Sequence, residues 1–581
     1  MYKYIVKKAF MKKRNIGLLT VLALLLWSGS LLAQDSLAAI LAGELAREMA
    51  ELAKQEVPPY YLSYRVDDVY AANVQASFGD LIESKDDRFR MLTVQVRVGS
   101  PALDNTHELR GGWDYLDAGW GSFNAAEMPL EDTTAAIRQA LWKATDTEYR
   151  ESVDMLARVK ANVAVKVAEE DRSPDFSAAP AAVYFEPPLK PEDRTFDRAA
   201  WEEKVKKYSK PFLDDPDIFD SEASIRFTVT RKYFVSSEGA RVVHNQAAAR
   251  LAIYARIKAA DGMVLPLFKD YFAFRPADLP DDSTVLRDVR EIVRKLTVLK
   301  TAPIVDPYAG PALLTAGSAG VFFHEIFGHR VEGERQKSES DAQTFKKKVG
   351  QKVLPTDLSV IFDPGLKQYR GQDMYGSYLY DDQGVNGQRL AVVDHGVLKG
   401  FLMSRCPIEN FPASNGHGRA QPGLQPVARQ SNLIVETSRP LPVAAMRQQF
   451  LAELKRQGKQ HGYLFADVTG GFTMTGRFIP NAFNVTPTEV YRVYVDGRPD
   501  ELVRGVDLVG TPLSVFSQIV AAGDRAEIFT GTCGAESGGV PVSAASPALF
   551  VKQIEIQRKS KSQELPPILP RPGLGRSAGN E

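Results

Sequence analysis

The chain has 581 residues and no formal net charge, because 72 lysines and arginines balance 72 aspartates and glutamates. This balance gives no sign of a nucleic-acid partner or an anionic surface, and a hydrophobic fraction of 44% excludes a disordered chain. The length exceeds one ordinary hydrophobic core, so two or three domains are expected.

The N-terminus has the pattern of an export signal. Lys12, Lys13 and Arg14 precede an apolar run over residues 16–26, and small residues up to Ala33 follow it. We predict a signal peptide over residues 1–33, and therefore a periplasmic or secreted protein. An uncleaved membrane anchor is the alternative, because the apolar stretch is nearly long enough to span a bilayer.

An N-terminal α/β domain is predicted over residues 34–190. Hydrophobic periodicity distinguishes its helices from its strands. The predicted elements are a helix over 37–52, strands over 61–77 and 91–99, and a helix over most of 133–167. The stretch 173–191 contains several prolines and breaks the pattern, so we place a domain boundary there.

A strand-rich central region is predicted over residues 191–300 and a mostly β C-terminal domain over 301–558. The central region combines paired strands with a helix, and the C-terminal domain has turn residues between apolar runs. The predicted features are strands within 225–260, a helix over 283–299, and hairpin turns at 394–396 and 496–497. The proline-containing tail, 559–581, is predicted to be disordered. The fold class is therefore α+β.

Residues 324–329 read HEIFGH and place two histidines around a glutamate. Two imidazoles can bind zinc, and a neighbouring carboxylate can remove a proton from water. The histidines are five residues apart, which is about 140° around a helix of roughly 3.6 residues per turn. A regular helix therefore cannot direct both at one ion. We expect the motif helix to begin near residue 319 and to widen locally to hydrogen bonds from i to i+5, which Gly328 would ease.

The segments around this motif resemble the TldD/PmbA family of metalloproteases, whose catalytic members carry H-E-x-x-x-H and a ligand cysteine near the C-terminus. The matching strings are HEIFGHRVEGE at 324–334, YDDQGVNGQRLAVVDHGVLKG at 380–400, NGHGR at 415–419 and FTGTCG at 529–534. The resemblance extends from about residue 225 to about residue 556.

The resemblance implies that His324, His329 and Cys533 bind zinc and that Glu325 is the general base. Three protein ligands leave the fourth tetrahedral position of zinc open. A counter-interpretation is a disulfide between Cys406 and Cys533, because these are the two cysteines of a chain that we expect to be exported.

Four further residues near these motifs invite functional interpretations. His417 and Arg419 are candidates for substrate binding or oxyanion stabilisation, and a surface-loop role is the alternative. Glu332 and Glu334 follow the second histidine. One of them is a candidate hydrogen-bond partner for a ligand histidine, and simple exposed charge is the alternative.

These observations predict an exported zinc peptidase that hydrolyses unfolded or short peptides. The resemblance also implies a dimer, which is either a homodimer or a heterodimer with a paralogue that lacks the metal residues. Two alternatives stay open. One is a hydrolase of non-peptide amides, and the other is a non-catalytic metal-binding assembly or interaction subunit. The intact Glu325 favours catalysis, because a structural metal site needs no base.

Overall fold

A computed structural model describes residues 35–109, 125–164, 171–473, 475–476, 483–510 and 512–559. The predicted signal peptide, 1–33, and residues 560–581 of the predicted tail lie outside these ranges. Within the described ranges, helices that combine the length and the apolar character needed to cross a membrane are absent. The mixed α+β fold class is confirmed.

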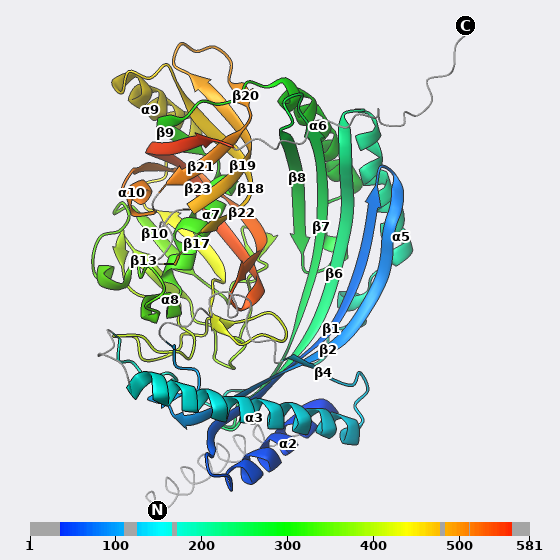
Figure 1. The fold of residues 1–581 in the computed structure, drawn as a ribbon. Coiled ribbons are helices and arrows are strands. Elements are labelled where there is room, and N and C mark those ends of the chain that lie inside the picture. The colour runs from blue at the N-terminus through cyan, green and yellow to red at the C-terminus, as the bar shows by residue number, and fades with distance from the viewer. Residues whose placement is uncertain are drawn as a thin grey trace, which may run out of the picture.

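An eight-stranded sheet forms the N-terminal part of the molecule (Figure 1). Its main strand order is β3-β2-β1-β6-β7-β5, with β4 paired to β2 and β8 paired to β7. The strands are β1 (Pro59–Ser77), β2 (Asp80–Ser100), β3 (Leu103–Asp104), β4 (Ala125–Glu127), β5 (Val183–Phe185), β6 (Ile218–Ser236), β7 (Arg241–Lys258) and β8 (Val264–Ala273). The long central strands curve alongside the C-terminal domain, so one face of the sheet is turned toward that domain (Figure 1).

Helices cover the opposite face of this sheet and its lower end. They are α2 (Ser36–Leu52), α3 (Thr134–Ala164), α5 (Arg198–Ser209) and α6 (Asp282–Thr301), and the short helix α4 (Pro191–Arg194) precedes α5. α5 and α6 pack on the central strands, and α2 and α3 pack on β1 and β2 near the lower end in Figure 1. The helices predicted over 37–52, 133–167 and 283–299 correspond to α2, α3 and α6. Their apolar stripes fill two separate cores against the sheet.

The pairing of strands crosses the boundary that the sequence places at residue 190. β1 pairs with β6 in antiparallel register, from Ser63 opposite Ser236 to Ala76 opposite Ala223. The predicted N-terminal domain and the predicted central region therefore contribute strands to one sheet. The chain passes from the first sheet to the second between α6 and β9 (Tyr308–Leu314), near residue 301, where the sequence places a domain boundary.

The C-terminal domain contains an eleven-stranded sheet with the main order β14-β13-β10-β17-β23-β21-β19-β18-β9. Its remaining strands are β10 (Leu358–Phe362), β13 (Leu390–Asp394), β14 (Val397–Leu398), β17 (Asn432–Thr437), β18 (His461–Thr473), β19 (Phe483–Tyr494), β20 (Glu501–Val503), β21 (Val506–Gly510), β22 (Ile519–Ala535) and β23 (Gly538–Arg558). β9 pairs with both β18 and β23, which closes β9, β18, β19, β21 and β23 into a ring. Hairpin turns at 394–396 and 496–497 join strands as predicted.

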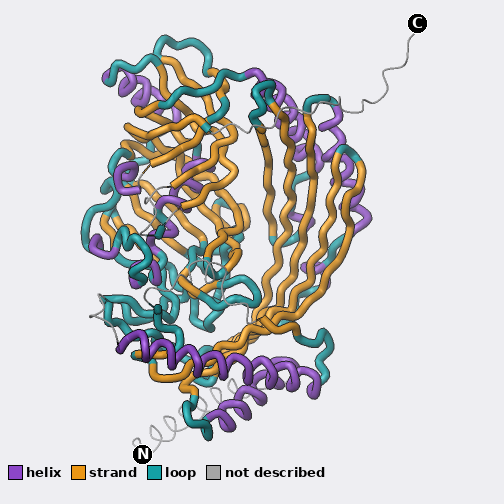
Figure 2. Tube along the Cα trace, in the orientation of Figure 1, coloured by secondary structure: helices purple, strands orange, loops and turns teal. Residues whose placement is uncertain are grey.

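Short elements and loops complete this domain (Figure 2). They are the helices α7 (Ala316–Ile326), α8 (Glu334–Lys337), α9 (Val443–Arg456) and α10 (Pro512–Phe516), and the strand pairs β11 (Gln368–Tyr369) with β12 (Gln372–Asp373) and β15 (Gly418–Arg419) with β16 (Val427–Ala428). α7 packs against β17, β18, β22 and β23, in the largest hydrophobic core of the domain. The histidine motif therefore begins on a helix buried within a β framework.

Candidate metal centre

α7 is a short buried helix that brings the first histidine to the sheet. The Thr315 hydroxyl caps its N-terminus by accepting a hydrogen bond from the Ser318 amide at 3.4 Å. Its residues are small or apolar until His324 and Glu325, as expected for a helix surrounded by protein. A Cβ at Gly320 would lie 2.8 Å from the Ala544 carbonyl oxygen, so glycine allows α7 to approach β23 closely.

The backbone changes direction between the two histidines. α7 ends at Ile326, Phe327 has φ −107° and ψ −52°, and a 3₁₀ turn follows over Gly328–Val331. The expected widening to i+5 hydrogen bonds is therefore wrong, because the helix ends and the chain tightens instead. This break brings the two imidazole rings to a centroid distance of 5.1 Å, with 73° between their planes.

Gly328 stands at this break because a side chain there would collide with Gln430. A Cβ at Gly328 would lie 1.8 Å from the Gln430 side-chain oxygen. Gln430 is fully buried, and its side-chain NH₂ donates a hydrogen bond to the His324 carbonyl oxygen at 3.2 Å. The glutamine thus supports the end of α7 and fills the space beside the glycine.

Gly328→Ala is expected to lower the free energy of unfolding by about 1–3 kcal/mol, because the added methyl group displaces a buried side chain from its hydrogen bond. Chemical denaturation of Gly328→Ala, Gln430→Ala and the double variant measures this coupling. The double variant should lose less stability than the two single losses combined. Strictly additive losses would show that this close contact does not account for the glycine.

The cysteine near the C-terminus completes a group of three donors. Cys533 lies on β22, and its Sγ is 3.3 Å from Nε2 of His329. One donor atom each from His324, His329 and Cys533 lie within 4.8 Å of one another, and all three residues are buried. Nitrogen and sulfur ligands of one tetrahedral zinc ion lie roughly 3.5 Å apart, given bonds of about 2.0–2.1 Å and about 2.3 Å. The donor set therefore fits zinc.

Electrostatic contacts support the charged form of this sulfur. Burial raises the pKa of Cys533, but the charges of His329 and Arg429 outweigh burial and hold that pKa well below its usual value. Burial lowers the pKa of His329, but Cys533 and Glu332 outweigh it and raise that pKa. The thiolate that zinc requires is thus favoured before any metal binds.

Glu332 orients the second histidine by contacting its Nδ1 atom. Its Oε2 lies 3.2 Å from Nδ1 of His329 and accepts a hydrogen bond from Nε of Arg335 at 2.8 Å. Burial raises the pKa of Glu332, but its cationic neighbours hold it at about 2. Because this carboxylate contacts Nδ1, the Nε2 atom of His329 lies on the side of the ring that faces Cys533. A carboxylate on the ring nitrogen that does not bind the metal is the usual arrangement of a ligand histidine. Glu334 instead accepts from the Ala428 amide at 2.8 Å and contacts Ser404.

A cavity of about 510 Å³ opens over the three donors. Glu325 also lines it, so the predicted base faces the same space as the predicted ligands. The wall is built from both sheets, because β7 and β8 contribute Arg250, Phe268 and Asp270 opposite β22. Gly470 and Gly471 of β18 line this cavity as well.

The two predicted substrate residues lie away from this cavity. His417 is fully buried, and its Nδ1 and Nε2 atoms face Asn415 and Ser431 at 3.0 and 3.3 Å. Arg419 donates to the Gln430 and Pro541 carbonyl oxygens at distances of at most 2.7 Å and lines a different cavity of about 380 Å³. Neither is a surface-loop residue, and both brace the backbone around the centre.

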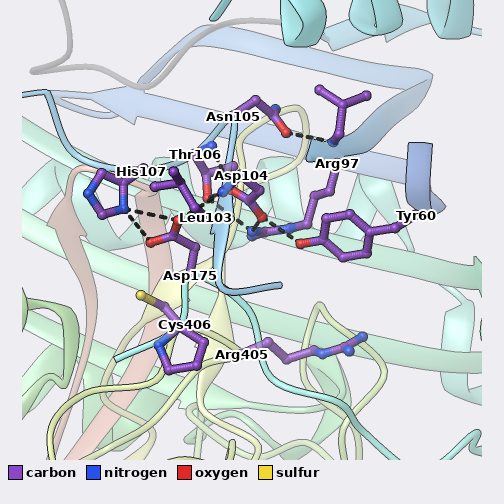
Figure 3. Close-up of polar contacts among 12 residues, drawn as sticks. Tyr60, Arg97, Leu103, Asp104, Asn105, Thr106, His107, Asp175, Arg405 and Cys406 are labelled. Atoms are coloured by element: carbon purple, nitrogen blue, oxygen red, sulfur yellow. Dashed lines mark hydrogen bonds and ion pairs between the residues drawn. The ribbon is translucent and has the colours of Figure 1, made fainter. Parts of the chain in front are cut away.

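Cys406 is free and lies in a separate part of the molecule (Figure 3). It lines a cavity of about 250 Å³ together with His107 and Asp175, whose side chains contact each other at 2.8 Å. Burial raises the pKa of the Cys406 thiol to about 12. Cys533 is also free, so the alternative of a disulfide between the two cysteines is wrong.

Sequence reasoning missed Arg429 and Gln430, which contact the ligand residues from the segment before β17. Gln430 holds the His324 carbonyl, and Arg429 donates to the Cys533 sulfur at 3.2 Å. They belong to no motif with a fixed spacing. The signal in the sequence is weak: a charged and an amide residue directly before an apolar strand.

Comparison with known proteins relates the C-terminal region to a protease family. Residues 308–558 match the family model described as the PmbA/TldA metallopeptidase C-terminal domain. A "Metalloprotease" of Archaeoglobus fulgidus is 30% identical over 264 residues, which cover 45% of this chain and 56% of that protein. A "Metalloprotease TldD homolog" of Haemophilus influenzae is 27% identical over 274 residues, covering 46% and 52%. The chain thus spans about half the length of these relatives.

A third relative and two solved structures extend this picture. A "Zinc metalloprotease TldD homolog" of Saccharolobus solfataricus is 23% identical over 361 residues, covering 61% of this chain and 71% of that protein. TldE from Thermococcus kodakarensis has a TM-score of 0.58 at 12% identity, covering 90% of this chain and all of that one. A putative modulator of DNA gyrase from Thermotoga maritima has a TM-score of 0.56 at 16% identity, covering 88% and 99%. These structures share the fold.

Proposed function

We propose that this chain is a zinc-dependent peptidase. Its family-model match and the names of its relatives support membership of the TldD/PmbA family. One observation carries the proposal: two imidazoles and a cysteine sulfur converge within 4.8 Å at a cavity that Glu325 also lines. Side chains that converge on one buried point, beside an available base, suit hydrolysis better than a purely structural metal site.

His324, His329 and Cys533 would hold the ion. Zinc, when bound, would supply the positive charge that polarises a carbonyl group and acidifies water. Glu325 takes up the proton of the attacking water and passes it to the leaving amine. Glu332 fixes the ring of His329, and Gln430 holds the backbone of His324, so both imidazoles keep their directions.

The proposed substrates are unfolded or short peptides, which can enter a cavity of about 510 Å³ as an extended chain. We also propose that the protein works as a dimer, either with itself or with a paralogue that lacks the metal residues, and that it is exported. The basic and apolar pattern of residues 1–33 supports export.

Zinc-loaded protein is expected to cleave peptides, to stop when a chelator removes the metal, and to recover when zinc is added back. The measurement is turnover of a mixture of unstructured peptides, followed by mass spectrometry, beside turnover of small non-peptide amides. Cleavage of small amides alone would favour the other hydrolase class. A protein that binds zinc yet cleaves neither substrate would support a non-catalytic subunit.

A further inference from the structure

Arg429 is a buried cation whose hydrogen bonds converge on the strand that carries the cysteine. Its side chain is fully buried, and Nη2 donates to the Cys533 carbonyl oxygen at 2.6 Å and to the Cys533 sulfur at 3.2 Å. Nη1 donates to the Ser537 hydroxyl at 2.7 Å and to the Gly538 carbonyl oxygen at 2.9 Å. One guanidinium group thus fixes the sulfur and the turn between β22 and β23.

The same arginine completes a ring of side-chain contacts that includes two of the three donor residues, His329 and Cys533. Nε of Arg429 lies 3.6 Å from Oε1 of Glu332, and among the described residues each of these two atoms lacks a hydrogen-bond partner. Glu332 contacts His329, and His329 contacts the sulfur of Cys533, which closes this ring of contacts at Arg429. Movement of any one member therefore changes the position of the other three.

The chemistry of the contact explains why an arginine occupies this position. A buried guanidinium group must be paired, and here its partners are the Cys533 sulfur, the Glu332 carboxylate, two carbonyl oxygens and a hydroxyl group. The planar fork reaches the sulfur and the β-turn together, whereas the single ammonium of lysine cannot span both groups. A charge-assisted hydrogen bond to a thiolate also withdraws negative charge from the sulfur.

We propose that Arg429 is a positioning residue for the metal centre, which directs the Cys533 sulfur and limits the negative charge that it donates to the ion. This inference rests on the proposed function, because it requires that Cys533 be a metal ligand. It goes beyond that function by naming the residue that adjusts the ligand. Hydrogen bonds from outside the ligand set commonly adjust metal affinity and the electronic properties of a centre.

Cobalt-loaded protein tests this proposal, because sulfur-to-cobalt charge transfer produces an absorption band that reports directly on the thiolate. Arg429→Met retains much of the side-chain volume and removes every donor. We expect its band to shift to lower energy, since the sulfur becomes richer in electrons. We also expect about 10–100-fold weaker metal binding in a chelator competition, because the sulfur loses its fixed direction. Arg429→Lys should shift the band by less.

The matched control is Arg335→Met. Arg335, like Arg429, is a largely buried arginine beside Glu332. Its hydrogen bonds go to Glu332, Thr475 and Glu536 and not to the sulfur. Its band should stay in the wild-type position, even if its metal affinity falls. A wild-type band in Arg429→Met would overturn the role of Arg429. If circular dichroism shows that Arg429→Met is unfolded, a wild-type absorption band in Arg429→Lys would overturn the role of Arg429 instead. Wild-type protein that binds no metal would contradict the proposed function itself.

Discussion

Replacing Glu325 with glutamine is expected to lower kcat for peptide cleavage by about 10²–10⁴-fold while the metal stays bound. Glutamine has nearly the same shape as glutamate, but its amide cannot take up a proton from water. Glu325 lies next to the proposed ligand His324 in the chain and lines the cavity over the three donors. The loss should therefore fall on kcat, with a small change in KM. Steady-state kinetics on one defined peptide, beside elemental analysis, measures both quantities.

Glu527→Gln is the matched control for this experiment. Glu527 lies on the cysteine-bearing strand β22 and accepts a hydrogen bond from the Gly317 amide at 3.3 Å, at the opposite end of α7. Removing its charge should change kcat little, because it touches the start of the helix and not the cavity. If Glu325→Gln instead cleaves peptides at the rate of the wild type, another group must serve as the base.

Cys533→Ala is expected to lose its metal on dialysis and, with it, all measurable peptide cleavage. Alanine removes one of the three proposed ligands and leaves Arg429 without one of its two anionic partners, which is costly for a buried cation. Elemental analysis after dialysis should find near-stoichiometric zinc in the wild-type protein and little in the variant. A modest fall in thermal stability should accompany the loss of metal.

Cys406→Ala provides the comparison for the cysteine experiment. Cys406 lines another cavity, and burial keeps its thiol protonated. Its substitution should therefore leave the metal content at the wild-type value. If Cys533→Ala retains stoichiometric zinc after dialysis, Cys533 is not a ligand, and the three-donor centre is wrong.

The elements that the sequence predicted well are those with a local signal. α2 and α6 have apolar stripes at helical spacing, and the hairpin turns at 394–396 and 496–497 have glycine after a polar residue. The strand pairing that joins the segments before and after residue 190 has no local signal. β1 pairs with β6 across a long intervening segment, and hydrophobic periodicity carries no information about which distant strand a strand will join.

The candidate site shows the same division between local and non-local information. The resemblance named His324, His329 and Cys533, and the structure brings them together. The break after Ile326 was not foreseen, and the close contact of Gly328 there is with Gln430, far along the chain, which no local pattern reveals. His417 and Arg419 were predicted to bind substrate from a matching string, but their contacts face the protein interior.

The distance along the chain between the donors has a consequence for a newly made molecule. Cys533 follows His329 by 204 residues, and it lies on β22, which pairs with β23. A ribosome-bound or truncated chain that lacks this hairpin holds two histidines and no third donor. A peptidase is dangerous to unfolded neighbours, including other copies of itself. Under the proposed function, completion of the three-donor centre by the C-terminal hairpin would therefore keep immature chains inactive.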